Sequence, residues 1–162
     1  MVRRRFLLAT LFALTVATPL LAGPAWIAIE FPANPYAPGS QDAFLMVHAF
    51  HHRAPAGLTV TGTAEGIVNG ARRSVPLALR GTQRTGVFAL TNQWGDAGVW
   101  SLVLTVTEAK ENQAQALVKV SDGKVVGVEV ATRQGRDGAR PLTFPRLFTQ
   151  AEIEASLRDR AE

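Results

Sequence analysis

The sequence predicts an all-β fold, a two-layer β-sandwich followed by a short C-terminal helix. From Trp26 to about Thr132, short apolar runs alternate with turn residues, and no helical period separates them. Short, closely spaced strands of this kind are typical of a sandwich and unlike the strand–helix alternation of α/β proteins. Because 47% of the chain is hydrophobic, packing alone can supply the core of a fold that has no disulfides.

A series of segments has the composition of β-strands. The clearest is Trp100–Thr107, where large apolar residues alternate with mostly hydroxylated ones and so create one apolar and one polar face. The pattern indicates about seven or eight strands in an immunoglobulin-like β-sandwich, with a small barrel as the alternative. The segments are Trp26–Phe31, Ala43–His52, Leu58–Val68, Ala71–Arg80, Gly86–Thr91, Trp100–Thr107, Ala116–Val120 and Val126–Val130.

Two local signals refine the strand assignment. Asn69 and Gly70 separate two strand-like runs, and both residues tolerate the positive φ that a type I′ hairpin turn requires. Pro76 lies within the run that follows and has no backbone N–H to donate. We therefore expect a hairpin at Asn69–Gly70 and an edge strand around Pro76.

The last thirty or so residues divide into a basic loop and a helix. Residues 133–148 contain Arg133, Arg136, Arg140 and Arg146 among glycine and proline, which indicates a loop or strap over the surface. We expect residues 149–162 to form a short helix.

A capping box marks the start of that helix. Thr149 precedes Glu152 by three residues, so each side chain can satisfy an unpaired backbone N–H of the other residue. Phe148 and Ile153 occupy the positions of a hydrophobic staple. Ile153 and Leu157 share a helix face, which we expect to dock on the sandwich.

The N-terminus predicts a secretory signal peptide over residues 1–22, with cleavage between 22 and 25. Arg3–Arg5 form a basic segment, Phe6–Val16 form an apolar run, and small residues follow Pro19. The apolar run is short for a permanent membrane anchor. The arginines resemble a twin-arginine signal, but the leucine-rich core favours the general secretory route. We expect a periplasmic or secreted protein without a membrane span after cleavage.

Charge and cysteine content exclude several function classes. The chain has 17 Lys and Arg against 13 Asp and Glu, but the leader holds three of those arginines, so the mature part is close to neutral. A nucleic-acid partner is therefore not expected. The absence of cysteine excludes disulfides, thiolate metal sites, a cysteine nucleophile and a lipid-modified cysteine.

All three histidines, His48, His51 and His52, lie in one strand-like segment near Met46. Histidine and methionine are ligands for copper. On a regular strand, His48 and His52 share a face but lie roughly 13 Å apart, and His51 points to the other face. These residues are therefore weak candidate metal ligands, unless the strand end curls or a second strand contributes. The favoured interpretation places His48 near the core and His51 and His52 at a polar strand end.

Other catalytic patterns are missing from the sequence. No serine lies in a Gly-x-Ser-x-Gly motif, and none is placed at a strand-to-helix turn. The carboxylates are scattered among turns and strand ends, without calcium-loop spacing. A hydrolase is therefore the third-ranked function, and we expect no catalytic or cofactor-binding residue.

Two aromatic residues in predicted loops are candidate contacts with a partner protein. Trp94 lies next to a glycine, and Tyr36 lies in the loop from Asn34 to Ser40. Exposed aromatics on such loops suit protein binding. The alternative for Trp94, favoured by the size of the side chain, is that it folds back and plugs the end of the sandwich.

The segments Thr85–Leu90 and Gly98–Leu104, with the spacing Gly-x-Trp-x-Leu-x-Leu in the second, resemble exported YtkA-like and FixH-like domains. The resemblance covers about half of the mature chain. It implies a periplasmic immunoglobulin-like sandwich, in a group in which some members handle copper or assist cytochrome oxidase assembly. This chain has no methionine cluster and no histidine at the expected mature N-terminus, so no ligands are transferred.

The sequence therefore predicts an exported, non-enzymatic module that binds another protein or an envelope component through its loops. The alternative is an accessory protein that binds copper through the region of His48 to His52. The partner, the oligomeric state and the biological process are left open.

Overall fold

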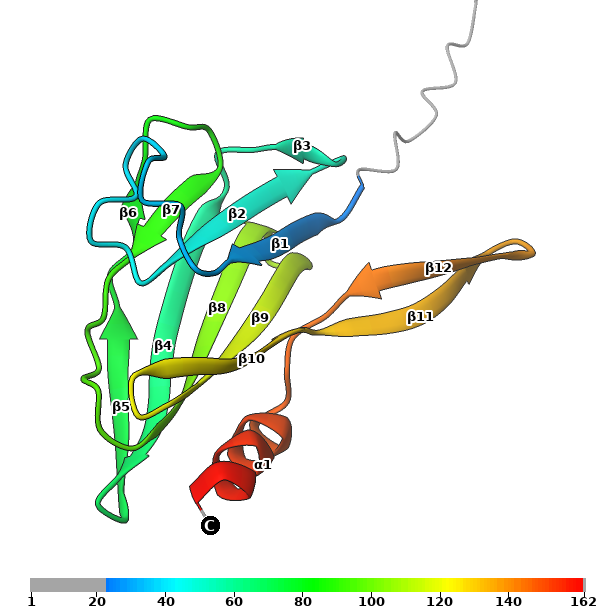
Figure 1. The fold of residues 1–162 in the computed structure, drawn as a ribbon. Coiled ribbons are helices and arrows are strands. Elements are labelled where there is room, and N and C mark those ends of the chain that lie inside the picture. The colour runs from blue at the N-terminus through cyan, green and yellow to red at the C-terminus, as the bar shows by residue number, and fades with distance from the viewer. Residues whose placement is uncertain (1–22, 162) are drawn as a thin grey trace, which may run out of the picture.

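The computed structural model describes residues 23–161 and shows a two-layer β-sandwich, a projecting β-hairpin and one C-terminal helix (Figure 1). The predicted signal peptide at residues 1–22 lies outside the described residues. The first sheet has the order β1-β2-β7-β6, and β3 also pairs with β2. Its strands are β1 (Ala25–Glu30), β2 (Leu45–His51), β3 (Ala54–Pro55), β6 (Arg80–Gly81) and β7 (Val87–Leu90).

The second sheet has the order β10-β9-β8-β4-β5, and each neighbouring pair is antiparallel. Its strands are β4 (Thr59–Val68), β5 (Ala71–Leu77), β8 (Val99–Ala109), β9 (Asn112–Ser121) and β10 (Lys124–Val130). All eight predicted strands are present, which confirms the all-β sandwich. The very short strands β3 and β6 were not predicted, because two residues show no alternation.

The predicted hairpin turn and the predicted edge strand are both confirmed. Asn69 and Gly70 connect β4 to β5 with φ values of 51° and 73°, the positive values that a type I′ turn requires. β5 contains Pro76 and forms the edge of the second sheet. A proline at that position costs no ladder hydrogen bond when the missing N–H would face outward.

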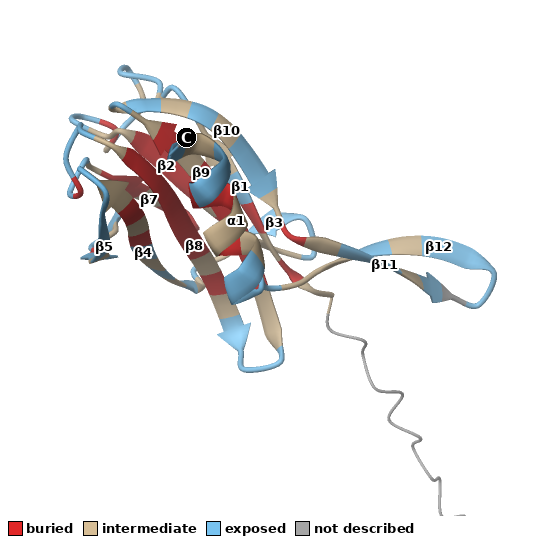
Figure 2. Cartoon of the chain, turned by 90° about the horizontal axis from the view of Figure 1, so that it is seen from below, coloured by how far each residue is buried: buried red, intermediate tan, exposed pale blue. Residues whose placement is uncertain are grey.

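The core lies between the two sheets, and it is centred on β8 and β9 (Figure 2). Trp100, Leu102, Leu104 and Val106 face inward from β8, as their alternation predicts, and all four are buried. Gly66 on β4 lies under the Trp100 ring, where an added Cβ would come within 2.3 Å of a ring carbon. The large indole therefore fits only because its cross-strand neighbour has no side chain.

Helix α1 (Gln150–Ala161) covers the outer face of the second sheet. Ile153 and Phe148 pack against Val103 and Leu117 on that face, and Leu157 is also buried. The predicted capping box is present, since the Glu152 N–H donates to Thr149 Oγ1 at 3.2 Å and the Thr149 N–H donates to Glu152 Oε2 at 2.7 Å.

Polar contacts hold helix α1 against the partly hydroxylated outer face of β8. Ser101 is completely buried and shares a 2.7 Å hydrogen bond with Ser156 of the helix. Arg160 donates to Ser101 Oγ and to the backbone oxygens of Trp100 and Val120. Burial lowers the pKa of Arg160. The partly hydroxylated face of β8 is thus an interface with the helix and not a solvent-exposed surface.

The expected basic loop over residues 133–148 is wrong for most of its length. β11 (Thr132–Asp137) and β12 (Arg140–Pro145) form an antiparallel hairpin, with Gly138 at positive φ in the turn. We call this hairpin the arm. It projects from the sandwich and is largely exposed (Figure 2). Because neither face of the arm enters the core, its strands carry only a weak apolar alternation.

Candidate functional site

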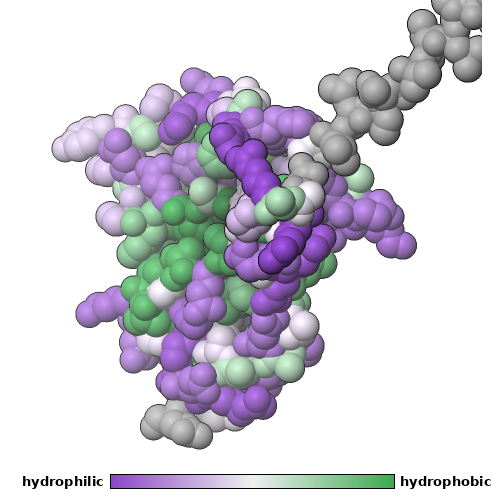
Figure 3. Space-filling view, turned by 90° about the vertical axis from the view of Figure 1, so that its right-hand side faces the viewer, coloured by the Kyte–Doolittle hydropathy of each residue, from purple (hydrophilic) through white to green (hydrophobic). Residues whose placement is uncertain are grey.

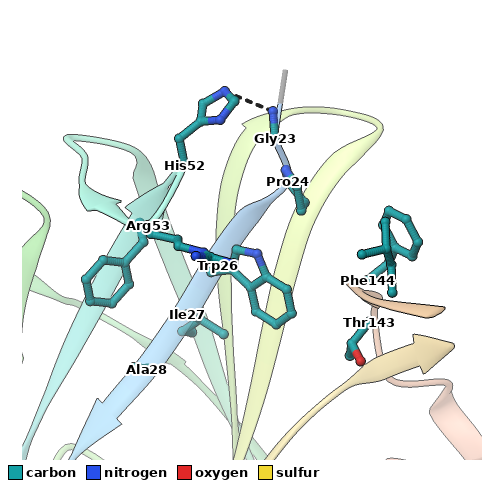
Figure 4. A pocket seen from close by; sticks show the side chains of 11 residues that line it. Gly23, Pro24, Trp26, Ile27, Ala28, His52, Arg53, Thr143 and Phe144 are labelled. Carbon is teal, nitrogen blue, oxygen red and sulfur yellow. Dashed lines mark hydrogen bonds between the residues drawn. The ribbon is translucent and has the colours of Figure 1, made fainter. Parts of the chain in front are cut away.

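The clearest concave surface lies between β1 and the arm. It has a volume of about 620 Å³ and is lined by Trp26–Ala28 of β1 and Leu142–Phe144 of β12, together with Phe50, His52 and Arg53 at the end of β2. We call it the β1–β12 groove. Figure 4 shows the Trp26 ring between β1 and β12, with Thr143 and Phe144 on the opposite wall.

The groove combines aromatic surface with positive charge. Trp26 and Phe50 are partners in the β1–β2 register and therefore lie on the same face of the first sheet. Arg53 is exposed at the rim, and no carboxylate is found among the described residues that line the groove. The arm adds exposed Arg136 and Arg140 near its tip. Rigid aromatic groups beside arginine are a composition enriched at protein-binding surfaces.

The sandwich is also incompletely covered next to β1. Val128 of β10 pairs with the buried Val118 of β9, so its side chain lies on the inner face of the second sheet. It is nevertheless 42% exposed, and Val126 is 57% exposed. β1 and β10 are in contact, and an apolar area is visible beside the arm in Figure 3. Apolar surface therefore extends beyond the groove along the open side of the sandwich.

The predicted metal ligands do not come together as one set. Met46 is buried with Val87 and Ala89. The His48 ring forms a 2.8 Å contact with Glu30 Oε2. Within the described residues, no group of three or more His, Asp or Glu side chains has a geometry that would hold a metal ion.

His51 and His52 do approach each other, with ring centroids 4.2 Å apart. The expectation that they point to opposite faces is wrong, because β2 ends at His51 and His52 adopts a φ of 50°. His52 Nε2 accepts a hydrogen bond from the Gly23 N–H at 2.9 Å. His51 Nδ1 lies 3.4 Å from Glu108, and its buried Nε2 has no hydrogen-bond partner among the described residues.

The two candidate partner contacts have opposite environments. Trp94 is only 7% exposed and packs edge-on against Phe44, with ring centroids 5.1 Å apart. An exposed contact at Trp94 is therefore wrong, and the indole plugs the sandwich end at the start of β2. Tyr36 is 94% exposed and remains available for contacts.

Two carboxylates have lowered pKa values, and both accept hydrogen bonds from neighbouring groups. Hydrogen bonds from the Asn34 N–H and from His48 hold the pKa of Glu30 below its usual value. The Arg146 guanidinium and Thr149 lower the pKa of Glu152 to about 2. Arg146 Nη2 lies 2.6 Å from Glu152 Oε1, and Arg146 Nε donates to the Thr132 oxygen. This second pair therefore connects the base of the arm to α1.

The residues that form the groove were not predicted from the sequence. Trp26 and Phe50 were assigned to strands, but nothing in their spacing showed that their face of the sheet stays partly open. Leu142 and Phe144 fell in the predicted loop. Their alternation with Pro141, Thr143 and Pro145 is a weak strand signal that the prolines and the neighbouring arginines obscured.

No family model, curated protein or solved structure matches this chain. The resemblance to YtkA-like and FixH-like domains therefore stays a prediction. Among residues 23–161, no helix is long and apolar enough to cross a membrane.

Proposed function

We propose that this protein is an exported, non-enzymatic binding module whose binding surface is the β1–β12 groove. The observation that carries the proposal is a concave surface of about 620 Å³ in which Trp26, Phe50 and Phe144 lie close to exposed arginine. Concave sites with aromatic walls and a few polar groups are the usual form of a ligand or peptide site.

This proposal moves the predicted binding surface from the loops to a strand edge. Trp94 is buried in the core. Of the two aromatic loop residues, only Tyr36 is therefore exposed enough to contact a partner. The groove offers several aromatic residues on two walls, whereas Tyr36 is a single exposed ring. Binding energy concentrates where aromatic anchors cluster in a water-excluding pocket.

Site-specific photocrosslinking in cells that export the protein tests the proposal. A photoreactive amino acid at Leu142 should produce a discrete crosslinked product, and Trp26→Ala should abolish it. The same photoreactive residue at Tyr36 is the matched control, because that position is exposed and does not line the groove. A product from Tyr36 that persists in Trp26→Ala, with none from Leu142, would restore the loop surface and reject the groove.

Metal handling is the second candidate function, and one observation favours it. His51 and His52 lie with ring centroids 4.2 Å apart, close enough for both imidazoles to approach one ion after a small rearrangement. Isothermal titration of the mature protein with copper tests this candidate. Heat at micromolar copper that disappears in His52→Ala would support it, and no heat in the parent protein would end it.

A further inference from the structure

Strand β1 has a backbone edge along the groove that no other described strand uses. Within residues 23–161, β1 pairs only with β2. Ile27 lies opposite Ala49 in that register, and the Ala49 N–H donates to the Gly86 oxygen on the far side of β2. Ile27 and Ala49 are therefore a pair without mutual hydrogen bonds, and the N–H and C=O of Ile27 point away from β2.

A second contact confirms this direction. The Ala25 N–H donates to the Asn112 side-chain oxygen at 2.7 Å, and that oxygen belongs to β9 rather than to a neighbouring strand of the first sheet. Because backbone groups alternate in direction along a strand, Ile29 points the same way as Ala25 and Ile27. Among the described hydrogen bonds outside β1–β2 pairing, none engages the backbone of Ile27 or Ile29.

The opposite wall of the groove is also a strand edge. In the part of the chain that the structure describes, β12 pairs only with β11, and its residues Leu142–Phe144 line the groove. An extended chain lying between β1 and β12 would meet a backbone edge on one side and a second strand on the other. It would also cover apolar surface such as Val128, which the first sheet leaves exposed. Unpaired strand edges are templates for an added strand.

Charge identifies the occupant. Arg53 is exposed at the groove rim and has no ion-pair partner among the described residues, and the two strands of the arm carry Arg133, Arg136 and Arg140 against a single acid, Asp137. A second copy that inserted its own arm would bring arginines toward arginines, which Coulomb repulsion opposes. An extended segment with acidic side chains has the complementary charge.

We propose that the β1–β12 groove binds an extended, acidic segment of another exported protein as an added β-strand. Main-chain hydrogen bonds to Ile27 and Ile29 give the affinity, and the pocket around Trp26 selects apolar side chains at alternate positions of the segment. The exposed arginines at the groove rim and on the arm attract acidic residues elsewhere in the segment. This inference rests on the proposed function and specifies the chemistry of its partner.

A labelled synthetic peptide of about eight residues, a usual strand length, with alternating valine and glutamate is the probe. Fluorescence anisotropy with the mature protein should show saturable binding. The peptide with lysine in place of glutamate should bind at least about tenfold more weakly at low salt, because its charge repels the arginines. A version N-methylated at alternate residues should lose binding, because it cannot form the main-chain bonds.

Variants of the protein locate the binding. Trp26→Ala should weaken binding about thirtyfold, the effect of a central aromatic anchor. Leu142→Asp should also weaken it and leaves the core untouched, because the arm lies outside the sandwich. Arg53→Glu should reduce binding at low salt, whereas Arg73→Glu, an exposed arginine on edge strand β5, is the matched control and should have no effect.

Amide exchange tests the strand geometry directly. Binding of the valine–glutamate peptide should slow hydrogen exchange at Ile27 and Ile29, whose amides have no hydrogen-bond partner among the described residues. It should leave Trp26 and Ala28 unchanged, because β2 already pairs with them. Peptide binding with no added protection at Ile27 and Ile29, or equal binding of the N-methylated peptide, would overturn strand addition.

The remaining outcomes separate this inference from the proposed function. No binding of the peptide at millimolar concentration, while Leu142 still crosslinks to a partner, would reject the acidic strand and retain the groove. Binding to vesicles that contain phosphatidylglycerol, dependent on Arg53 and without peptide binding, would assign the charge to lipid instead. Loss of both crosslinking and peptide binding would reject both proposals.

Discussion

Trp94 and Trp26 lie near opposite ends of strand β2 and have different roles. Trp94 packs against Phe44, immediately before β2, and closes that end of the sandwich. Trp26 lies across from Phe50, near the other end of β2, and forms a wall of the β1–β12 groove. The comparison shows that a loop tryptophan can complete the core while a strand tryptophan marks the open surface. Exposure therefore depends on what the rest of the fold covers.

The largest expected effect on stability comes from removing the Trp94 indole, which closes one end of the sandwich. Trp94→Ala should destabilise the protein by about 3–5 kcal/mol in chemical denaturation, because it empties a large buried volume. Tyr36→Ala is the matched control and should change stability by less than about 0.5 kcal/mol, since that ring is 94% exposed.

Trp94→Phe sharpens the same experiment. The Trp94 indole nitrogen is buried and has no hydrogen-bond partner among the described residues. A phenyl ring retains most of the packing and removes an unsatisfied polar group. Trp94→Phe should therefore cost clearly less than Trp94→Ala. Equal losses for both variants would mean that the indole nitrogen has a partner, such as an ordered water.

The contrast between the two tryptophans also shows how far the sequence could predict this protein. Strands were predictable because alternation reports directly on one buried face, as at Trp100 to Val106. The burial of Ser101 was not predictable, because it depends on Arg160 and Ser156 from a helix about sixty residues later in the chain. Nothing local in the strand marks such a partner.

The groove was less predictable than the fold for a related reason. It requires Trp26, at one end of the chain, and Phe144, near the other, to face each other across a gap. Each residue is unremarkable within its own segment. A strand edge that stays unpaired is a property of the assembled sheet, so only the register of β1 with β2 exposes it.

A second, smaller effect tests the middle of the sandwich. Gly66→Ala should destabilise the protein by about 1–3 kcal/mol, because the new Cβ would overlap the Trp100 ring. Gly81→Ala is the matched control, since no atom lies within 4 Å of the added Cβ there. It should be neutral or slightly stabilising. Equal melting temperatures for both variants would show that β4 and β8 adjust freely around Trp100.

Trp26→Ala is expected to be milder than Trp94→Ala. The Trp26 side chain is half-buried on the outer face of the first sheet, so its removal should cost about 1–2 kcal/mol. Chemical denaturation of the two variants side by side measures the difference. If Trp26→Ala lowered the free energy of unfolding as much as Trp94→Ala, Trp26 would be a core residue. The proposed difference between a closed end and an open groove would then be wrong.

The smallest expected effect concerns the joint between the arm and the helix. Arg146 lowers the pKa of Glu152 to about 2, well below its usual value of 4.5. A carboxylate whose pKa is depressed in the folded state stabilises the protein above its unfolded pKa, and this contribution disappears as the pH falls through the folded value. Glu152→Gln keeps the capping geometry but removes the charge. The difference in melting temperature between the parent protein and Glu152→Gln should therefore be constant above about pH 5. It should shrink as the pH falls from about 4.5 toward 2.

Glu111→Gln is the control for this experiment, because Glu111 is exposed and forms no ion pair among the described residues. It should show no such pH-dependent difference from the parent protein. The ion pair lies at the surface, so the expected change is small and should decrease in high salt. Arg146 also binds the Thr132 oxygen, so Glu152→Gln should loosen the base of the arm and speed amide exchange in β11. If exchange in β11 stays the same while the melting temperature shifts, the pair stabilises only α1, and the arm is held in place over the groove by its other contacts.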